Sequence, residues 1–91
     1  MAEWIVQDSQ TWQLSGDLNV NTVTVLLKAF SQHNQKPQVV DLSAVTRTDS
    51  AGLALLLELK RLTRQSSLTL QNMPQQMSQL AQVNDVTALL V

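Results

Sequence analysis

A run of leucines crowds the middle of this chain: six of the thirteen residues from 50 to 62 are leucine. On a helix with about 100° of rotation per residue, these leucines spread over about 220° of the circumference, more than one core-facing stripe requires. A chain of 91 residues is too short to surround a helix on all sides. We therefore expect Leu55, Leu59 and Leu62, with Leu56 beside them, to pack on a core, and the opposite flank to stay open.

That opposite flank combines apolar and basic side chains. It consists of Leu53, Ala54, Leu57, Lys60, Arg61 and Arg64. An apolar patch with a basic rim is typical of a protein-binding surface. A simpler alternative is that Leu53 and Leu57 pack under a loop.

The rest of the chain alternates strand-like and helix-like patterns. Strands are expected at 3–7, 11–15, 38–42 and 67–71, and helices at 19–36, at 50–64 and from Pro74 onward. Asp8-Ser9-Gln10 predicts a hairpin turn, Asn19 or Asn21 is expected to cap the first helix, and SAVTRT (43–48) reads as a loop. Residues 38–71 have the pattern of a parallel β-α-β unit. The order β-β-α-β-α-β-α predicts an α/β fold made of one domain over residues 1–91, with the apolar tail 86–91 packed down on it.

Composition removes several functional classes. The net charge is −1, and only 14% of residues are charged, so there is no basic stripe for nucleic acid. The chain has no cysteine, which excludes disulfides and thiolate metal sites. No signal peptide is evident at the N-terminus, and no apolar stretch is long enough for membrane insertion. A cytoplasmic protein is expected.

Ser50 opens the leucine-rich helix and admits more than one interpretation. Together with Asp49 it suits the N-cap, a role for which serine and aspartate are preferred. Phosphorylation of Ser50 is a sharper alternative, because a helix N-terminus favours negative charge; Arg47 could pair with the phosphate and Asp49 would oppose it. Catalysis is not expected, because a nucleophilic serine needs a base and the single histidine, His33, falls near the end of the preceding helix.

Neither a metal nor a cofactor is predicted. Asp17, Asp41 and Asp49 follow no recognisable ligand spacing. Gly52 is a lone glycine, whereas a phosphate-binding loop needs a glycine-rich run that ends in Lys-Ser or Lys-Thr.

Three segments nevertheless resemble a known family. LSGDL (14–18), VVDLSAV (39–45) and TDSAGLALLLELKRL (48–62) are similar to STAS domains, the sulfate-transporter and anti-sigma-factor-antagonist domains. The resemblance covers nearly the whole chain. It implies a mixed β-sheet with helices packed on one side, no catalytic residues, and a position for Ser50 at which STAS proteins carry a phosphorylatable serine or threonine.

Within the family, LSGDL and GLALLLEL most resemble the small STAS subunit of Mla-type ABC phospholipid transporters, which maintain outer-membrane lipid asymmetry. That subunit usually has threonine where this chain has Ser50. The resemblance implies a non-catalytic subunit that binds the transporter ATPase, alongside a permease, and is thereby peripheral to the inner membrane. The expected contact residues are the flank described above together with Thr48, Asp49, Ser50, Ala51 and Gly52. The alternative is an anti-sigma factor antagonist regulated by phosphorylation of Ser50.

Overall fold

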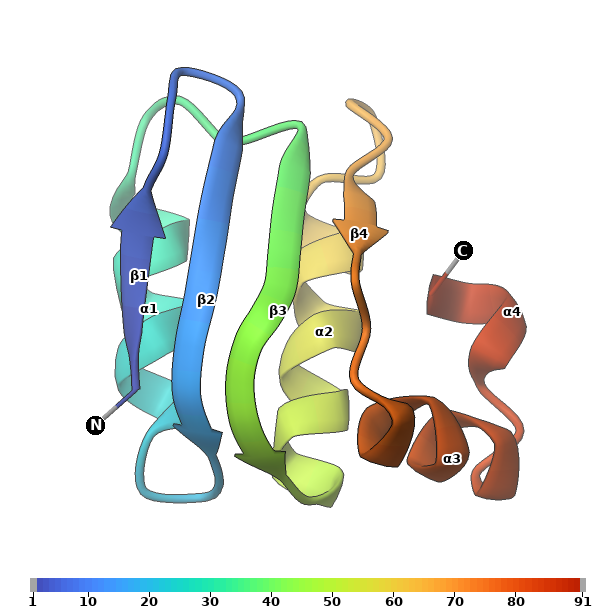
Figure 1. Cartoon of the computed structure of the whole chain (residues 1–91). Coiled ribbons are helices and arrows are strands. Elements are labelled where there is room, and N and C mark those ends of the chain that lie inside the picture. Colours follow the sequence, from blue (N-terminus) through green and yellow to red (C-terminus); the bar gives the residue numbers. More distant parts are fainter. Residues whose placement is uncertain (1, 91) are drawn as a thin grey trace.

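Four strands form one mixed sheet in the order β1-β2-β3-β4 (Figure 1). The computed structural model describes residues 2–90. The strands are β1 (Glu3–Val6), β2 (Thr11–Leu18), β3 (Val39–Thr48) and β4 (Thr69–Gln71). β1 is antiparallel to β2, while β2 with β3 and β3 with β4 are parallel. The predicted hairpin and the predicted parallel β-α-β unit are both present.

The hairpin turn is stabilised by Asp8, the aspartate of the predicted turn. One carboxylate oxygen of Asp8 accepts hydrogen bonds from the backbone N–H groups of Gln10 and Thr11, each at 2.8 Å. This arrangement lets an Asp side chain replace backbone partners in a tight turn.

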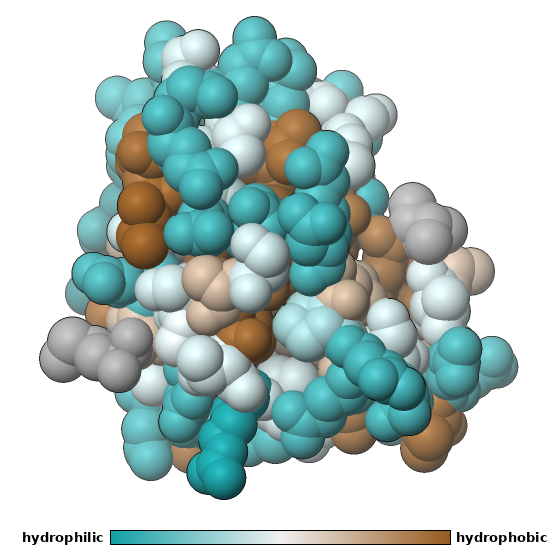
Figure 2. Space-filling model, viewed as in Figure 1, coloured by the Kyte–Doolittle hydropathy of each residue, from teal (hydrophilic) through white to brown (hydrophobic). Residues whose placement is uncertain are grey.

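The helices are α1 (Val23–Gln32), α2 (Ser50–Leu62), α3 (Gln75–Val83) and α4 (Thr87–Leu90). Figure 1 shows α1 and α2 behind the sheet, with α3 and α4 following beyond the β4 edge. The front of the sheet is uncovered and mostly hydrophilic in Figure 2. The predicted mixed sheet with helices on one side is therefore confirmed, and the apolar tail forms the additional short helix α4, with Leu90 buried.

The core lies between the sheet and the helices. Each long element contributes fully buried side chains, among them Leu14, Leu18, Phe30, Val40, Leu42, Leu56 and Leu59. An aromatic cluster closes the β1 end, where the rings of Trp4 and Trp12 lie 5.5 and 5.6 Å from the ring of Phe30. The indole N–H of Trp4 donates to the carbonyl oxygen of Leu26 at 2.9 Å. The aromatic rings thus attach the hairpin to α1.

Two boundaries differ from the sequence-based expectation. SAVTRT is not a loop: β3 continues through it to Thr48, because β2 also extends to Leu18 and the two strands stay paired across two register shifts. α1 begins at Val23 rather than 19, and neither expected asparagine caps it, because the N-cap position is occupied by Thr22. The hydroxyl of Thr22 donates instead to the carbonyl oxygen of Asp17 at 2.9 Å. The first difference lengthens β3, the strand that leads directly to the start of α2.

Candidate functional site

The start of α2 is capped by Asp49. Its carboxylate accepts a hydrogen bond from the N–H of Ala51 at 2.8 Å, which satisfies one of the free donors of the first helical turn. Ser50 is the first helical residue and is exposed. The interpretation of Ser50 as the cap is therefore wrong, because the neighbouring aspartate already takes that role. The serine hydroxyl is left at the surface, at the positive end of the helix dipole.

Gly52 allows α2 to approach the sheet closely. A Cβ atom at this position would lie 2.0 Å from Oγ1 of Thr48 and 2.9 Å from Cβ of Leu18, both too near for real atoms. Thr48 and Gly52 are buried. The backbone N–H of Asp49 also donates to the carbonyl oxygen of Leu18 at 3.3 Å. These two buried residues thus position the start of α2, but neither is available to contact a partner.

The flank that we expected to be open is partly covered. Leu53 is only 4% exposed and belongs to the core, whereas Leu62, expected in the core, is 37% exposed. Leu57 is half-buried and packs against the core cluster. The expectation for Leu53 and Leu62 is therefore wrong. α2 packs against α1 as well as against α3 and α4, so neither side of it is free along its length. Leu62 is the last residue of α2 and is left partly exposed there.

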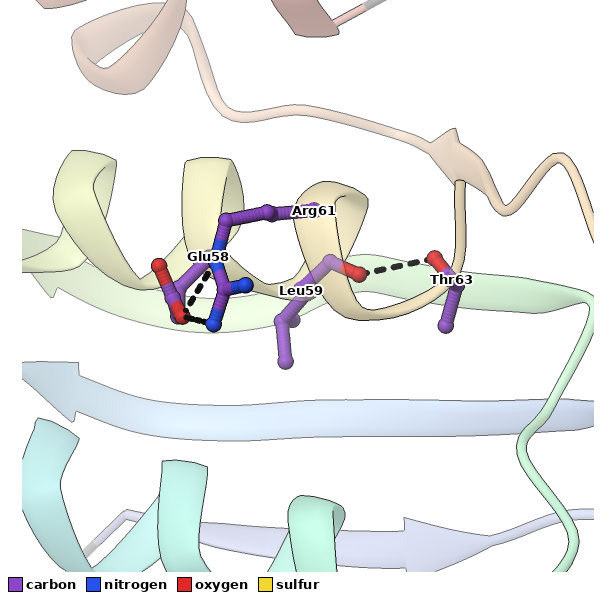
Figure 3. Close-up of polar contacts among 4 residues, drawn as sticks. All are labelled: Glu58, Leu59, Arg61 and Thr63. Carbon is purple, nitrogen blue, oxygen red and sulfur yellow. Dashed lines mark hydrogen bonds and ion pairs between the residues drawn. The ribbon is translucent and has the colours of Figure 1, made fainter. Parts of the chain in front are cut away.

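The expected basic rim is divided between two directions. The guanidinium of Arg61 donates to the carboxylate of Glu58, with Nε 2.8 Å from Oε1 (Figure 3). This hydrogen bond holds the pKa of Glu58 below its ordinary value. Lys60 instead donates from Nζ to the carbonyl oxygen of Leu68, ahead of β4. Lys60 and Arg64 face β4 and the C-terminal helices, so they do not form one rim with Arg61.

An apolar groove lies between α1 and α2. Its volume is about 350 Å³, and we call it the α1–α2 groove. Its lining residues are Val23, Thr24 and Leu27 of α1, and Ala51, Ala54, Leu55 and Glu58 of α2. Ala54 is exposed and Ala51 is half-buried, so these two small side chains leave the space open. Among the residues expected to contact a partner, the structure brings Ala51 and Ala54 together at this groove, next to the exposed Asp49 and Ser50.

Sequence reasoning missed the α1 wall of this groove. Val23 and Leu27 line the groove from α1, and the helical spacing of apolar residues in α1 does not mark them as part of a surface. The one signal in the sequence was the pair of alanines at 51 and 54, three residues apart on a helix otherwise full of leucine, because small side chains at that spacing mark a gap on one face.

Ser50 and the single histidine, His33, lie far apart in the fold. α1 begins at the same end of the sheet as α2 and runs to the opposite end (Figure 1), and His33 is its C-cap residue. His33 and Ser50 are therefore at opposite ends of the fold. Between residues 2 and 90, no group of three or more His, Cys, Asp or Glu side chains is placed to hold a metal ion. Over the same residues, none of the helices has both the length and the apolar character that a membrane span requires.

Comparison with known proteins identifies the fold and the family of this chain. The structure resembles that of the anti-sigma factor antagonist SpoIIAA in its unphosphorylated form, with a TM-score of 0.75 and 13% sequence identity, covering 100% of this chain and 86% of SpoIIAA. At that identity the likeness demonstrates the fold alone. A search of curated proteins gave no significant match. The family described as "Mlab, STAS domain" matches residues 3–91, and the chain therefore belongs to this STAS domain family.

Proposed function

We propose that this protein is a non-catalytic subunit that binds the ATPase of an Mla-type ABC phospholipid transporter, and that it supports the assembly and activity of that transporter. The match to the Mlab family over residues 3–91 carries the proposal. In this role the chain is cytoplasmic, and it lies at the inner membrane through the transporter complex.

The α1–α2 groove and the start of α2 are the proposed contact surface. Exposed apolar side chains there would be covered by a partner, which is the usual source of affinity at a protein interface. Ala54 lies in the groove and Ser50 lies at its end, so a protruding apolar side chain of the ATPase would insert between the helices while a polar group reached the serine. Glu58 lines the groove and is paired with Arg61.

The other predicted contact residues take different parts in this proposal. Thr48, Gly52 and Leu53 are buried and position the surface from beneath. Leu57 and Lys60 lie on the other flank of α2, and Arg64 lies just beyond its end beside the same flank; none of the three is part of the proposed contact.

Substitution of Ala54 by aspartate tests the surface directly. The carboxylate of Ala54→Asp would enter an apolar groove, so we expect the ATPase to be lost from affinity purifications of the tagged subunit from its native cell. Ala29→Asp is the matched control, because Ala29 is also an exposed alanine within a helix but lies on the opposite side of α1 from Leu27. Thermal unfolding should be similar for both variants.

Two results would count against the proposal in different ways. If no ABC transporter ATPase is recovered with the wild-type protein, the function is wrong. If the ATPase is recovered equally well with Ala54→Asp and Ala29→Asp, the function stands and the surface is wrong.

Regulation by phosphorylation is the second candidate function. The observation that favours it is the exposed Ser50 at the N-terminus of α2, because a phosphate there would be stabilised by the helix dipole. An anti-sigma factor antagonist would be phosphorylated at this residue by its partner serine kinase. Incubation with a serine kinase encoded beside the protein's gene should label the wild-type protein and not Ser50→Ala; absence of label on Ser50 would eliminate this candidate.

A further inference from the structure

A larger groove lies on the other flank of α2, between the end of that helix, β4 and the C-terminal helices. We call it the β4–α4 groove. Its volume is about 840 Å³, within the range of small-molecule sites. Figure 2 shows apolar side chains in the hollow between the body of the protein and the C-terminal helices at the right. The proposed contact surface for the ATPase does not include this groove.

The floor of the β4–α4 groove is apolar. Leu68 and Leu90 are buried, and Leu70 and Met73 are half-buried. Leu89 stands at the rim with 62% of its surface exposed. These side chains come from β4, from the residues just before and after it, and from α4, so a hydrocarbon chain in the groove would be covered by several elements.

One end of the groove is cationic. Lys60, in the last turn of α2, and Arg64, just beyond the C-cap Thr63, both line the groove. Among residues 2–90, no Asp or Glu lines the groove. The one ion pair within the same residues joins Glu58 to Arg61, and neither of these lines the groove. The ammonium of Lys60 is fixed at this end by donating to the carbonyl oxygen of Leu68. A lysine has three such donors, so two N–H groups remain for a ligand.

We propose that the β4–α4 groove binds a single-chain anionic amphiphile, such as an alkyl carboxylate or alkyl phosphate. Its head group contacts Lys60 and Arg64, and its chain lies over Leu68, Leu70 and Leu90. Charge-assisted hydrogen bonds select for the anion, and the apolar floor selects for the chain. An inorganic anion would leave the floor exposed to water, and a neutral amphiphile would leave the two cations unpaired.

Amide NMR of the isotope-labelled full chain, titrated with dodecanoate below its critical micelle concentration, tests this. We expect saturable shifts at residues 68–73 and 87–90, with the α1–α2 groove unaffected. A neutral amphiphile, dodecyl maltoside, should bind on the order of tenfold more weakly, as expected when charge-assisted hydrogen bonds are lost. Inorganic phosphate should give no saturable shift at the floor.

Variants separate the head group from the chain. Arg64→Gln should weaken dodecanoate binding on the order of tenfold without altering the fold, because Arg64 is exposed. Leu89→Asn should weaken it by a smaller factor. Lys28→Gln, which changes an exposed lysine on α1, is the matched control and should bind as the wild type does.

The proposal is overturned if dodecanoate gives no saturable shift, or if Arg64→Gln binds as tightly as Lys28→Gln. Sedimentation with phosphatidylglycerol vesicles distinguishes a free amphiphile from a lipid within a bilayer. Binding to vesicles without any response to monomeric dodecanoate would also overturn the proposal, because the site would then recognise a membrane surface.

Discussion

The two flanks of α2 carry similar apolar side chains, but one flank is mostly buried and the other lines an open groove. On the flank toward α3, Leu53 is buried and Leu57 is half-buried, because the C-terminal helices pack along it. On the flank toward α1, the small side chains of Ala51 and Ala54 leave a groove, and Leu62 is 37% exposed. Leucine content therefore does not decide which flank is open; the size of the neighbouring side chains and the elements that cover them do.

The sharpest test of this comparison is to truncate one leucine on each flank. Leu53→Ala should destabilise the protein by about 3 kcal/mol, because it leaves a cavity in the core. Leu62→Ala should cost less than about 1 kcal/mol, because a partly exposed side chain loses little burial. Urea unfolding followed by circular dichroism measures both free energies. Equal losses for the two variants would mean that the flanks are not distinct.

The strand and helix order was predictable because it rests on local signals. The aspartate of the hairpin turn, the short apolar run at 38–42 and the leucine-rich helix each act over a few residues. The extent of β3 was not predictable in this way. Thr46 and Arg47 are exposed and polar, which is typical of a loop, yet they continue the strand because β2 pairs beside them through Leu18.

The candidate site was predicted less well, and for a related reason. The helical pattern correctly grouped Leu53 and Leu57 apart from Leu55 and Leu59, but it gives only relative angles around the axis. The absolute rotation of α2 depends on the contact of Gly52 with the ends of β2 and β3. What covers each flank depends on α1 and α3, which the leucine pattern does not contain.

Gly52 fixes the rotation of α2 about its axis, so replacing it should change which side chains each flank buries. At an open helical site, Gly→Ala stabilises by about 1 kcal/mol. At residue 52 the new methyl group would overlap the side chains of Thr48 and Leu18, so we expect Gly52→Ala to destabilise by about 2 kcal/mol instead. The sign of the change in urea unfolding is the decisive measurement.

A double-mutant cycle identifies the source of that loss. Thr48→Ala removes the nearer of the two overlapping atoms, so the double variant should be more stable than the sum of the single effects implies. Additive effects would show that Thr48 is not what excludes a side chain at residue 52.

The smallest expected effect concerns the charges, which also differ between the flanks. Glu58 borders the α1–α2 groove and is paired with Arg61, whereas Lys60 and Arg64 on the other flank have no carboxylate partner among the described residues. Glu58→Gln should slightly lower the stability at neutral pH, and the difference from the wild type should disappear at about 1 M salt, where exposed charges are screened.

The pH dependence of that difference has a definite sign. The pKa of Glu58 is lowered from 4.5 by the hydrogen bond from Arg61, so the carboxylate contributes stability above its ordinary pKa and loses it as the pH falls through the lowered value. Unfolding curves of the wild type and Glu58→Gln should therefore converge in acid. Arg61→Gln should reproduce the small loss, and Arg64→Gln should not show the same dependence on acid. If Arg64→Gln behaved as Arg61→Gln does, the basic side chains would act as one group, and the assignment of Arg61 and Arg64 to separate flanks would have to be abandoned.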